Sequence, residues 1–255
     1  DEFDIKVIEN EENVSFSKGN NDGVKIANGE YILLLNNDIE PTYGWLNEMM
    51  GTIIYNENVG AVGAKLIYPY FDDLEQQKYS FTIQHAGDII REKINNGCLY
   101  EPQNLNKYSK DIFDNSISSN RKCALVTGAV LLTKKDIYME VGGLDEGFWY
   151  GYEDVDFNLK LYEKGYDVYF ASAALLLHHE SATPKKAQYL NNHNLLCGKW
   201  GEFLFKKLLK DKLEKKCFFT DKTLHFLFVV DDDFMEDKKL KDSLHNLATY
   251  LNEKN

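Results

Sequence analysis

The chain has 255 residues, 44% of them hydrophobic, and a formal net charge of −12 at pH 7. This composition is typical of a globular protein with one large domain, or with one domain and an appendage. The negative charge argues against general nucleic-acid binding, and no apolar run approaches the roughly 20 residues that a membrane-spanning helix needs. Four scattered cysteines without a CxxC pair indicate reduced thiols in a cytosolic protein.

The first part of the chain alternates predicted strands and helices. In order, the patterns predict a strand at 5–8, a polar turn at 13–21, a helix at 23–27, a strand at 31–35, a helix at 45–55 and a strand at 59–68. Strand, helix and strand in this order predict a right-handed crossover and a mainly parallel sheet.

The middle of the chain is less regular. Its patterns predict a strand at 81–90, a polar loop at 93–120 and a strand at 124–133. Helices at 134–141 and 154–164 and short strands at 168–170 and 174–177 are predicted next. Gly128 lies in the middle of one of these strands. A glycine there indicates that another group approaches the backbone closely.

Residues 199–216 form a predicted amphipathic helix with seven lysines against three acidic residues. We expect it to pack on the domain with a solvated lysine face. The alternative is attachment to an anionic membrane surface, with Trp200 and Phe203 on the apolar side. A strand at 224–230 and a last helix complete the predicted elements.

The apolar strand at 31–35 is followed directly by Asn36-Asn37-Asp38. In an α/β sheet, ligands bind beyond the carboxyl ends of the strands, and a carboxylate there can hold Mg²⁺ or Mn²⁺ on a diphosphate. Asn and Asp also suit an Asx turn followed by a helix N-cap. The tripeptide alone leaves both interpretations open.

Glu153-Asp154 stands at the start of a predicted helix. The helix dipole favours acidic residues in a first turn, so capping alone could account for the pair. The preceding residues 143–152 are rich in glycine and aromatic residues, as is typical of the wall of a sugar pocket. This setting favours a functional acidic pair and places Trp149 and Tyr152 on the acceptor side.

His178-His179 follows a short apolar strand. A single histidine at such a position is more often a satisfied core residue than a ligand. Two in succession after two acidic motifs favour a site, because carboxylate oxygens and an imidazole can together hold a divalent cation. Successive strand side chains face opposite ways, so only one of the two can point at a metal. The pattern alone leaves open which of the two does so.

Taken together, these segments resemble the family 2 glycosyltransferases of the GT-A fold, especially the bacterial rhamnosyltransferase-like branch. The resemblance covers residues 5–183. It rests on an ordered set of motifs: NVSFSKGNN (13–21), ANGEYILLLNND (27–38), VGAK (62–65), QHAG (84–87), TGA (127–129), GGLDE (142–146), EDVD (153–156) and HHES (178–181).

The resemblance implies an α/β GT-A (Rossmann-like) fold, a mixed and mainly parallel sheet flanked by helices, and a Mn²⁺ or Mg²⁺ cofactor. It implies that Asp38 contacts the metal and the donor diphosphate, that Asn36 lies near the donor ribose, and that His178 is a metal ligand. It also implies that Asp154 is the catalytic base with Glu153 beside it. With His178 at the metal, we expect His179 on the acceptor side.

The resemblance further places Lys18, Asn20 and Gly128 among the donor-binding residues. The sequence departs from the family pattern at Ser15, where a glycine is common, and at Asn36, a weaker ligand than aspartate. The family's opening nucleotide-binding strand would lie before Asp1. We therefore expect an incomplete, N-terminally truncated GT-A domain at 1–198, a helical C-terminal extension at 199–255, and the remainder of a longer polypeptide as a partner.

The expected function is inverting transfer of a sugar from a UDP- or dTDP-sugar to a glycan or lipid-linked acceptor in bacterial surface polysaccharide synthesis. The expected location is cytoplasmic, and contact with the inner leaflet of the membrane is the alternative that the basic helix leaves open. One rival is a non-catalytic GT-A-like domain that binds glycan or a partner protein. A weaker rival is a hydrolase that uses Asp38 and Asp154, because no water-activating pair is evident.

Overall fold

The computed structural model describes residues 5–95, 98–180 and 186–213, which lie within one unit, Asp1–Asp221. Its helices are α1 (Phe16–Ile26), α2 (Trp45–Tyr55), α3 (Lys135–Glu140), α4 (Glu153–Glu163) and α5 (Lys186–Leu213). Its strands are β1 (Tyr31–Leu35), β2 (Ile39–Pro41), β3 (Val59–Ile67), β4 (Ile83–His85), β5 (Asp88–Asn95), β6 (Cys98–Asn104), β7 (Arg121–Lys122), β8 (Val130–Lys134) and β9 (Asp167–His178).

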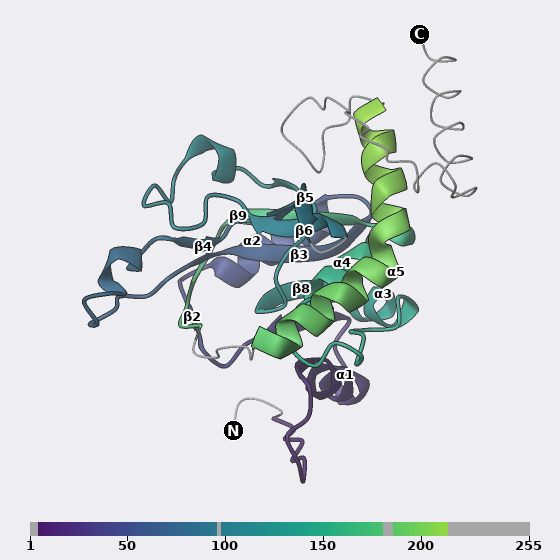
Figure 1. Ribbon diagram of the computed structural model, residues 1–255. Coiled ribbons are helices and arrows are strands. Elements are labelled where there is room, and N and C mark those ends of the chain that lie inside the picture. Colours follow the sequence, from purple (N-terminus) through teal and green to yellow (C-terminus); the bar gives the residue numbers. More distant parts are fainter. Residues whose placement is uncertain (1–4, 96–97, 181–185, 214–255) are drawn as a thin grey trace. The chain divides into compact units, whose positions relative to one another are not determined.

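The central sheet has the order β1-β8-β3-β9-β2, with β4 paired to β3 and β7 paired to β9 (Figure 1). Among the described strands, β3 and β9 pair in parallel, and the other ladders are antiparallel. The mixed α/β fold is therefore confirmed, and the expectation of a mainly parallel sheet is wrong. The reason is that β8 lies between β1 and β3, so the two strands of the predicted crossover are not neighbours.

The strand directions bring three strand ends to one edge of the sheet. Because β8 is antiparallel to both β1 and β3, the strands β1, β3 and β9 all run the same way. After β1 the chain turns, and β2 folds back along the end of β9 with Ile39 opposite His178. The segment that carries Asn36 and Asp38 thus meets a histidine 140 positions later in the chain.

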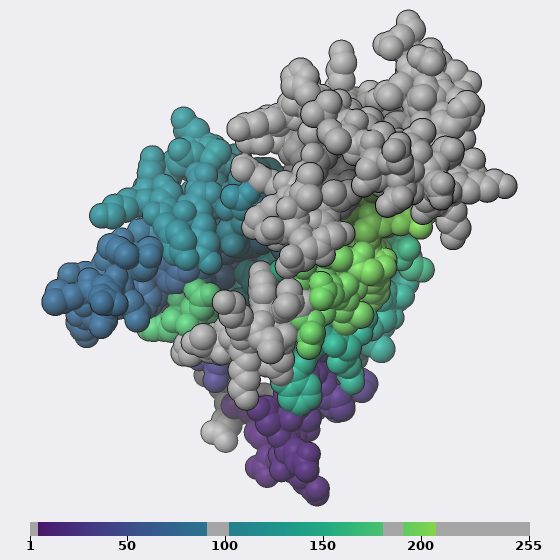
Figure 2. Space-filling model, in the orientation of Figure 1, coloured from purple at the N-terminus to yellow at the C-terminus, as the bar shows by residue number. Residues whose placement is uncertain are grey.

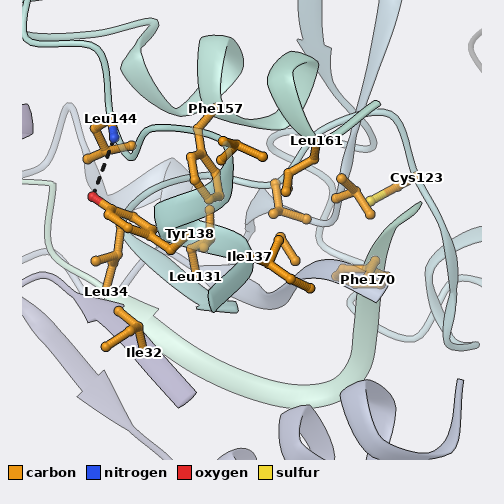
Figure 3. Close-up of a cluster of buried hydrophobic side chains, with 14 of the residues drawn as sticks. Ile32, Leu34, Cys123, Leu131, Ile137, Tyr138, Leu144, Phe157, Leu161 and Phe170 are labelled. Carbon is orange, nitrogen blue, oxygen red and sulfur yellow. Dashed lines mark hydrogen bonds between the residues drawn. The ribbon is translucent and has the colours of Figure 1, made fainter. Parts of the chain in front are cut away.

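Helices cover both faces of the sheet (Figure 1). On one face, Met49 and Ile53 of α2 pack against Val62 and Leu66 of β3. The other face packs against α3 and α4, and Figure 3 shows Tyr138, Phe157 and Leu161 from these helices over side chains of the sheet, among them Ile32, Leu34, Leu131 and Phe170. Strands buried on both faces account for the continuous apolar runs of the sequence.

The N-terminal helix is longer than the sequence predicts. α1 begins at Phe16 with Ser15 as its N-cap, where the Ser15 hydroxyl accepts a hydrogen bond from the Lys18 amide. The predicted polar turn at 13–21 is therefore wrong, and so is the strand predicted at 5–8, which has no ladder in the structure. Contacts with distant residues stabilise α1, since Asn21 donates to the Leu144 carbonyl oxygen at 2.9 Å.

The region between β3 and α3 also differs from the prediction. The strand predicted at 81–90 is divided into β4 and β5 by a turn at Gly87, whose φ of +74° favours glycine. Part of the loop predicted at 93–120 is β6, which pairs with β5. The strand predicted at 124–133 begins only at Val130, because residues 124–128 bond to Asp88 and to α4 instead.

The remaining elements follow the prediction closely. β1 and α2 have the predicted bounds, and β3 and α4 differ from them by a single residue. The two short strands expected at 168–170 and 174–177 form one strand, β9, with a register irregularity where it pairs with β3.

The predicted basic helix is the second half of α5, which runs without a break through the expected domain boundary at 198–199. Trp200 and Leu204 are each 4% exposed and pack against Phe148 and Leu159. The domain-packing interpretation therefore holds for the described part of this helix. Figure 2 shows α5 in green and α1 in purple on the same face of the described part of the chain, with a teal segment between them. The strand and helix predicted beyond residue 213 lie outside the described residues.

The cysteines differ from one another. Cys123 is a free, buried thiol, and its burial raises its pKa. Cys197 is disulfide-bonded, so the expectation of reduced thiols is wrong for this residue. No helix in the described residues is long and apolar enough to cross a membrane.

Candidate functional site

Asp38 and His178 meet at the edge where β1 and β9 end. The Oδ1 atom of Asp38 lies 3.3 Å from the Nε2 atom of His178. The backbone holds this approach, since the His179 amide donates to the Asp38 carbonyl oxygen at 3.0 Å. Asn36 lies on the same turn, and its backbone amide donates to the Ala129 carbonyl oxygen at 2.9 Å. The structure thus brings the two predicted metal ligands together.

A hydrogen-bond chain fixes which nitrogen of His178 carries the proton. The amide nitrogen of Gln84 lies 3.0 Å from a carboxylate oxygen of Glu180, which can only accept, so the amide oxygen of Gln84 must face His178. That oxygen lies 2.6 Å from His178 Nδ1. An amide oxygen accepts, so Nδ1 is the protonated nitrogen and Nε2 presents a lone pair toward Asp38.

A lone pair of Nε2 and a carboxylate oxygen at 3.3 Å are two acceptors that face each other. A cation or a proton between them removes the repulsion. Burial lowers the pKa of His178, although the Asp38 charge opposes this, so the environment disfavours the proton. A carboxylate oxygen and an imidazole nitrogen are both donors that Mg²⁺ and Mn²⁺ accept, so Asp38 and His178 are the residues that would hold such a cation.

The protein side of such a metal site is small. Within the described ranges, no group of three or more histidine, cysteine or acidic residues could hold a metal ion together. Asp38 and His178 would then supply two ligands, and diphosphate oxygens and water would fill the remaining positions. This composition is chemically suited to Mg²⁺ or Mn²⁺.

Glu153 and Asp154 open α4 after Tyr152, which has a left-handed backbone with φ of +72°. Asp154 is partly exposed, and each of its oxygens accepts a backbone hydrogen bond: Oδ2 from Gly128 at 2.9 Å and Oδ1 from Val155 at 2.8 Å. A carboxylate oxygen has two lone pairs, so each oxygen keeps one for another partner. Asp154 is therefore both fixed in place and able to accept a proton.

Glu153 occupies a different environment. Its side chain is 7% exposed, and its Oε2 atom has no hydrogen-bond partner in the structure. Burial, with a further contribution from the neighbouring Asp154 charge, raises the pKa of Glu153 from 4.5 to about 8. Burial also raises the pKa of Asp154, and the amides of Gly128 and Val155 oppose that rise. Near neutral pH, Glu153 keeps its proton.

Gly128 is the point where three segments converge. A Cβ atom at Gly128 would lie 3.3 Å from the Cβ of Asp154 and 3.4 Å from a ring carbon of Phe16 in α1. The close approach that the sequence predicts at this glycine is confirmed, and the approaching groups are α1 and the start of α4. Donor binding by Gly128 itself stays a prediction.

The predicted donor-binding residues of α1 make contacts within the helix. The ammonium of Lys18 pairs with Asp22, and the amide of Asn20 donates to the Phe16 carbonyl oxygen at 2.8 Å. α1 also holds the loop before α4, because the Ser17 hydroxyl donates to the Phe148 carbonyl oxygen at 3.3 Å. Nucleotide contact by Lys18 and Asn20 stays a prediction.

The three predicted acceptor-side residues lie in different surroundings. Trp149 is 47% exposed, and His179 is exposed with its Nε2 atom 3.6 Å from Glu40. Tyr152 is 6% exposed and packs against α5, where its ring centroid lies 5.8 Å from that of His193. Trp149 and His179 are accessible for an acceptor, whereas the burial of Tyr152 supports a packing position at the start of α4.

The structure adds two groups of residues to the site that the sequence did not assign. β4 places Gln84 on His178, and the neighbouring His85 binds Asp88. α5 holds the loop before α4, since the amide of Asn192 donates to the carbonyl oxygens of Tyr150 and Gly151 at 2.7 and 2.9 Å. The QHAG motif was a signal for β4, but no periodicity or spacing indicated Asn192.

Two protein-family models and several curated proteins match this chain. The model of glycosyl transferase family 2 matches residues 1–119, and the model of the N-terminal domain of galactosyltransferase matches residues 115–182. The chain is 30% identical over 208 residues to the uncharacterized protein y4gI of Sinorhizobium fredii, covering 77% of this chain and 21% of that protein. It is also 30% identical over 174 residues to the O-antigen biosynthesis protein RfbC of Myxococcus xanthus, covering 64% of this chain and 12% of RfbC.

The chain thus spans about a fifth or less of these bacterial relatives. Among solved structures, it is similar to GalNAc-T7 with UDP, GalNAc and Mn²⁺, at a TM-score of 0.56 and 16% identity over 93% of this chain and 43% of that one. At this identity the likeness concerns the fold. The two family models together match residues 1–182 with a GT-A architecture, and the chain belongs to the family 2 glycosyltransferases.

Proposed function

We propose that this chain carries the reaction centre of an inverting glycosyltransferase, which moves a sugar from a nucleotide-sugar donor to a hydroxyl of an acceptor. The observation that carries the proposal is that the two acids at the start of α4 lie in different environments. Asp154 is partly exposed and held by two backbone amides, whereas Glu153 is buried with a raised pKa. A partly exposed carboxyl that two backbone amides hold in place, beside a neutral acid, is suited to act as the single general base.

In the proposed reaction, Asp154 accepts the proton of the acceptor hydroxyl as its oxygen attacks the anomeric carbon. The new oxygen–carbon bond forms on the face opposite the nucleoside diphosphate, and the bond between the anomeric carbon and the diphosphate breaks, so the configuration inverts. Glu153 stays protonated and adds no second negative charge beside the base. Holding both substrates in line supplies much of the remaining acceleration.

Asp38 and His178 are the residues that would hold Mn²⁺ or Mg²⁺. Their facing acceptor atoms and the hydrogen bond from His178 to Gln84 support this part of the proposal. A divalent cation there offsets the charge that grows on the leaving diphosphate. The similar GalNAc-T7 structure contains UDP and Mn²⁺.

The substrate classes come from the same reasoning. A nucleoside diphosphate donor of the UDP- or dTDP-sugar type suits this edge of the sheet, which presents the Asp38 carboxylate, the His178 imidazole and the side-chain amide of Asn36. The similarity to an O-antigen biosynthesis protein supports a glycan or lipid-linked acceptor in bacterial surface polysaccharide synthesis. A cytoplasmic site of action beside the inner leaflet follows from such an acceptor and stays a prediction.

A second candidate is a GT-A domain that binds glycan without catalysis. The observation that favours it is the small metal site, since within the described residues only Asp38 and His178 meet there. The partly exposed Asp154 and the shifted pKa of Glu153 oppose it, because a non-catalytic surface has no need of a buried, neutral acid beside a partly exposed one.

The decisive experiment compares Asp154→Asn with Glu163→Gln, an exposed acid on the same helix. The full-length protein is given UDP- and dTDP-sugars and membrane lipids from the producing cells, and release of nucleoside diphosphate is measured. Asp154→Asn is expected to lose at least about a hundredfold in turnover, as for removal of a general base, and Glu163→Gln to retain it. Full turnover by Asp154→Asn would refute the base assignment, and absence of turnover with every donor would favour the non-catalytic candidate.

A further inference from the structure

A second polar cluster lies beside the proposed reaction centre, built from His85, Asp88 and Asn104. His85 ends β4 and is 2% exposed. Its Nδ1 atom lies 3.0 Å from the Oδ1 atom of Asp88 and 3.3 Å from the side-chain amide nitrogen of Asn104, which itself donates to that Asp88 oxygen at 2.9 Å. Because a carboxylate oxygen only accepts, Nδ1 carries a hydrogen, and the ring is held in one tautomer.

This arrangement leaves the other ring nitrogen, Nε2 of His85, without a hydrogen-bond partner among the residues that the structure describes. A buried polar atom without a partner is destabilising, and native proteins rarely keep one without a reason. His85 is thus a buried, oriented imidazole with one unused hydrogen-bonding position. A ligand hydroxyl can donate to this position.

The backbone connects this cluster to the proposed base. Gly87 turns the chain with φ of +74°, and the Asp88 amide then donates to the Leu125 carbonyl oxygen at 2.8 Å. Three residues after Leu125, the Gly128 amide donates to Asp154. The cluster and Asp154 are therefore fixed by the same segment, 124–128.

The charges of the cluster also act on the proposed base. The charge of Asp88 raises the pKa of Asp154 and His85 lowers it, in addition to the larger effect of burial. The cluster therefore acts on the base, beside which an acceptor hydroxyl must sit, while the neighbouring Gln84 contacts His178.

We propose that His85, oriented by Asp88 and Asn104, is a binding residue of an acceptor subsite, where its Nε2 atom accepts a hydrogen bond from a hydroxyl of the acceptor sugar. The proposal rests on the proposed function in that it takes the acceptor to be a glycan. The subsite would select a sugar with a hydroxyl adjacent to the one that Asp154 deprotonates. His85 touches the substrate but takes no part in bond making.

The test measures sugar binding rather than turnover, so its outcome is separable from that of the proposed function. The probes are methyl glycosides of hexoses, 6-deoxyhexoses and N-acetylhexosamines, added to the full-length protein with UDP and Mn²⁺ and followed by saturation-transfer NMR. We expect at least one glycoside to bind the wild-type protein and His85→Phe to weaken that binding about tenfold, as for loss of one hydrogen bond. The exposed neighbour of Asn104 supplies the control, Gln103→Ala, which is expected to bind as the wild type does.

Two further measurements cover a folding defect in His85→Phe. The conservative variant His85→Gln, which can present an amide group near the Nε2 position, is expected to recover part of the binding. In the wild-type protein, the ¹⁵N resonance of His85 Nε2 is expected to shift when the glycoside is added, whereas binding of UDP alone leaves it in place. Glycoside binding unchanged in His85→Phe, an unmoved Nε2 resonance, or no binding of any glycoside would each overturn the proposal, whether or not the protein turns over a donor.

Discussion

Glu153 and Asp154 are neighbours in the chain, yet they titrate in different environments. Glu153 is buried with one oxygen unpartnered, whereas Asp154 is partly exposed and receives two backbone amides. The sequence shows that both residues are acids. Which of them keeps its proton depends on the burial of each carboxyl, which the conformation of the loop at 147–152 sets. At the scale of single residues, burial decides the chemistry.

The raised pKa of Glu153 makes a prediction about stability. Between the ordinary value of 4.5 and about 8, the folded state keeps the Glu153 proton and the unfolded state releases it. The free energy of unfolding therefore falls as the pH rises through this window. We expect Glu153→Gln, which resembles the neutral acid, to unfold at a higher temperature than the wild type at pH 8 and at a similar temperature at pH 4.5.

The measurement is thermal unfolding of both proteins across pH 4.5–8.5. Glu163→Gln, which removes an exposed acid from the same helix, controls for a change in net charge and is expected to show no comparable divergence. A constant difference between Glu153→Gln and the wild type at all pH values would contradict the assignment of the proton to Glu153.

At the scale of elements, β4 is short but carries two neighbouring side chains with different partners. Gln84 binds His178, and His85 binds Asp88. Successive side chains of a strand point to opposite faces, so adjacent residues of β4 can serve two separate groups. β4 pairs with the end of β3, which places both residues at the edge where β1 and β9 also end.

The contact between Gln84 and His178 predicts an effect on metal binding. Gln84→Leu removes the acceptor of the Nδ1 hydrogen, so His178 is no longer held with its Nε2 lone pair toward Asp38. Loss of such a supporting hydrogen bond typically weakens metal affinity 10–100-fold. We expect a decrease of about tenfold or more in Mn²⁺ affinity, measured in the presence of UDP by electron paramagnetic resonance of free Mn²⁺.

The control for this measurement is Gln77→Ala, which removes an exposed glutamine that bonds to Tyr70. It is expected to bind Mn²⁺ as the wild type does. Equal affinity in Gln84→Leu and the wild type would show that Gln84 does not orient a metal ligand.

At the scale of the whole molecule, α5 ties the proposed reaction centre to the second half of the domain. Trp200 donates to the buried Asp156 at 2.7 Å, and Lys199 lies 2.7 Å from both Asp145 and Asp156. The apolar side of the helix is therefore used for packing, and the lysines that remain outside face a chain with a net charge of −12.

This packing predicts weak membrane contact for the basic helix. Each lysine near an anionic surface contributes about 1 kcal/mol, but Lys206 pairs with Glu202, and Trp200 is not available for insertion. We expect the full-length protein to stay in the supernatant when it is sedimented with phosphatidylglycerol vesicles at physiological salt, and Lys206→Glu with Lys207→Glu to change nothing. Salt-sensitive sedimentation that this double variant abolishes would instead establish the helix as a membrane-binding element.

Elements with strong local patterns could be predicted from the amino-acid sequence alone. The apolar run of β1, the amphipathic period of α2 and the glycine after α4 gave their bounds to within a residue, because burial on both faces or on one stripe leaves a direct trace in the pattern. The sequence also determined the family and the acidic motifs, since the order of several short motifs is specific even when each is weak.

Features that depend on contacts between residues far apart in the chain could not be predicted from the sequence pattern. α1 forms from a polar, asparagine-rich segment because Ser17 and Asn21 bond to residues more than a hundred positions away. Because β8 lies between β1 and β3, the sheet is mainly antiparallel. The strand β1, the helix α2 and the strand β3 nevertheless follow one another along the chain in the predicted order. The pairing of Asp38 with His178 and the orphaned nitrogen of His85 depend on strand register and on the supporting side chains of β4. A one-dimensional pattern contains neither, because it records which side chains are apolar and not which of them meet.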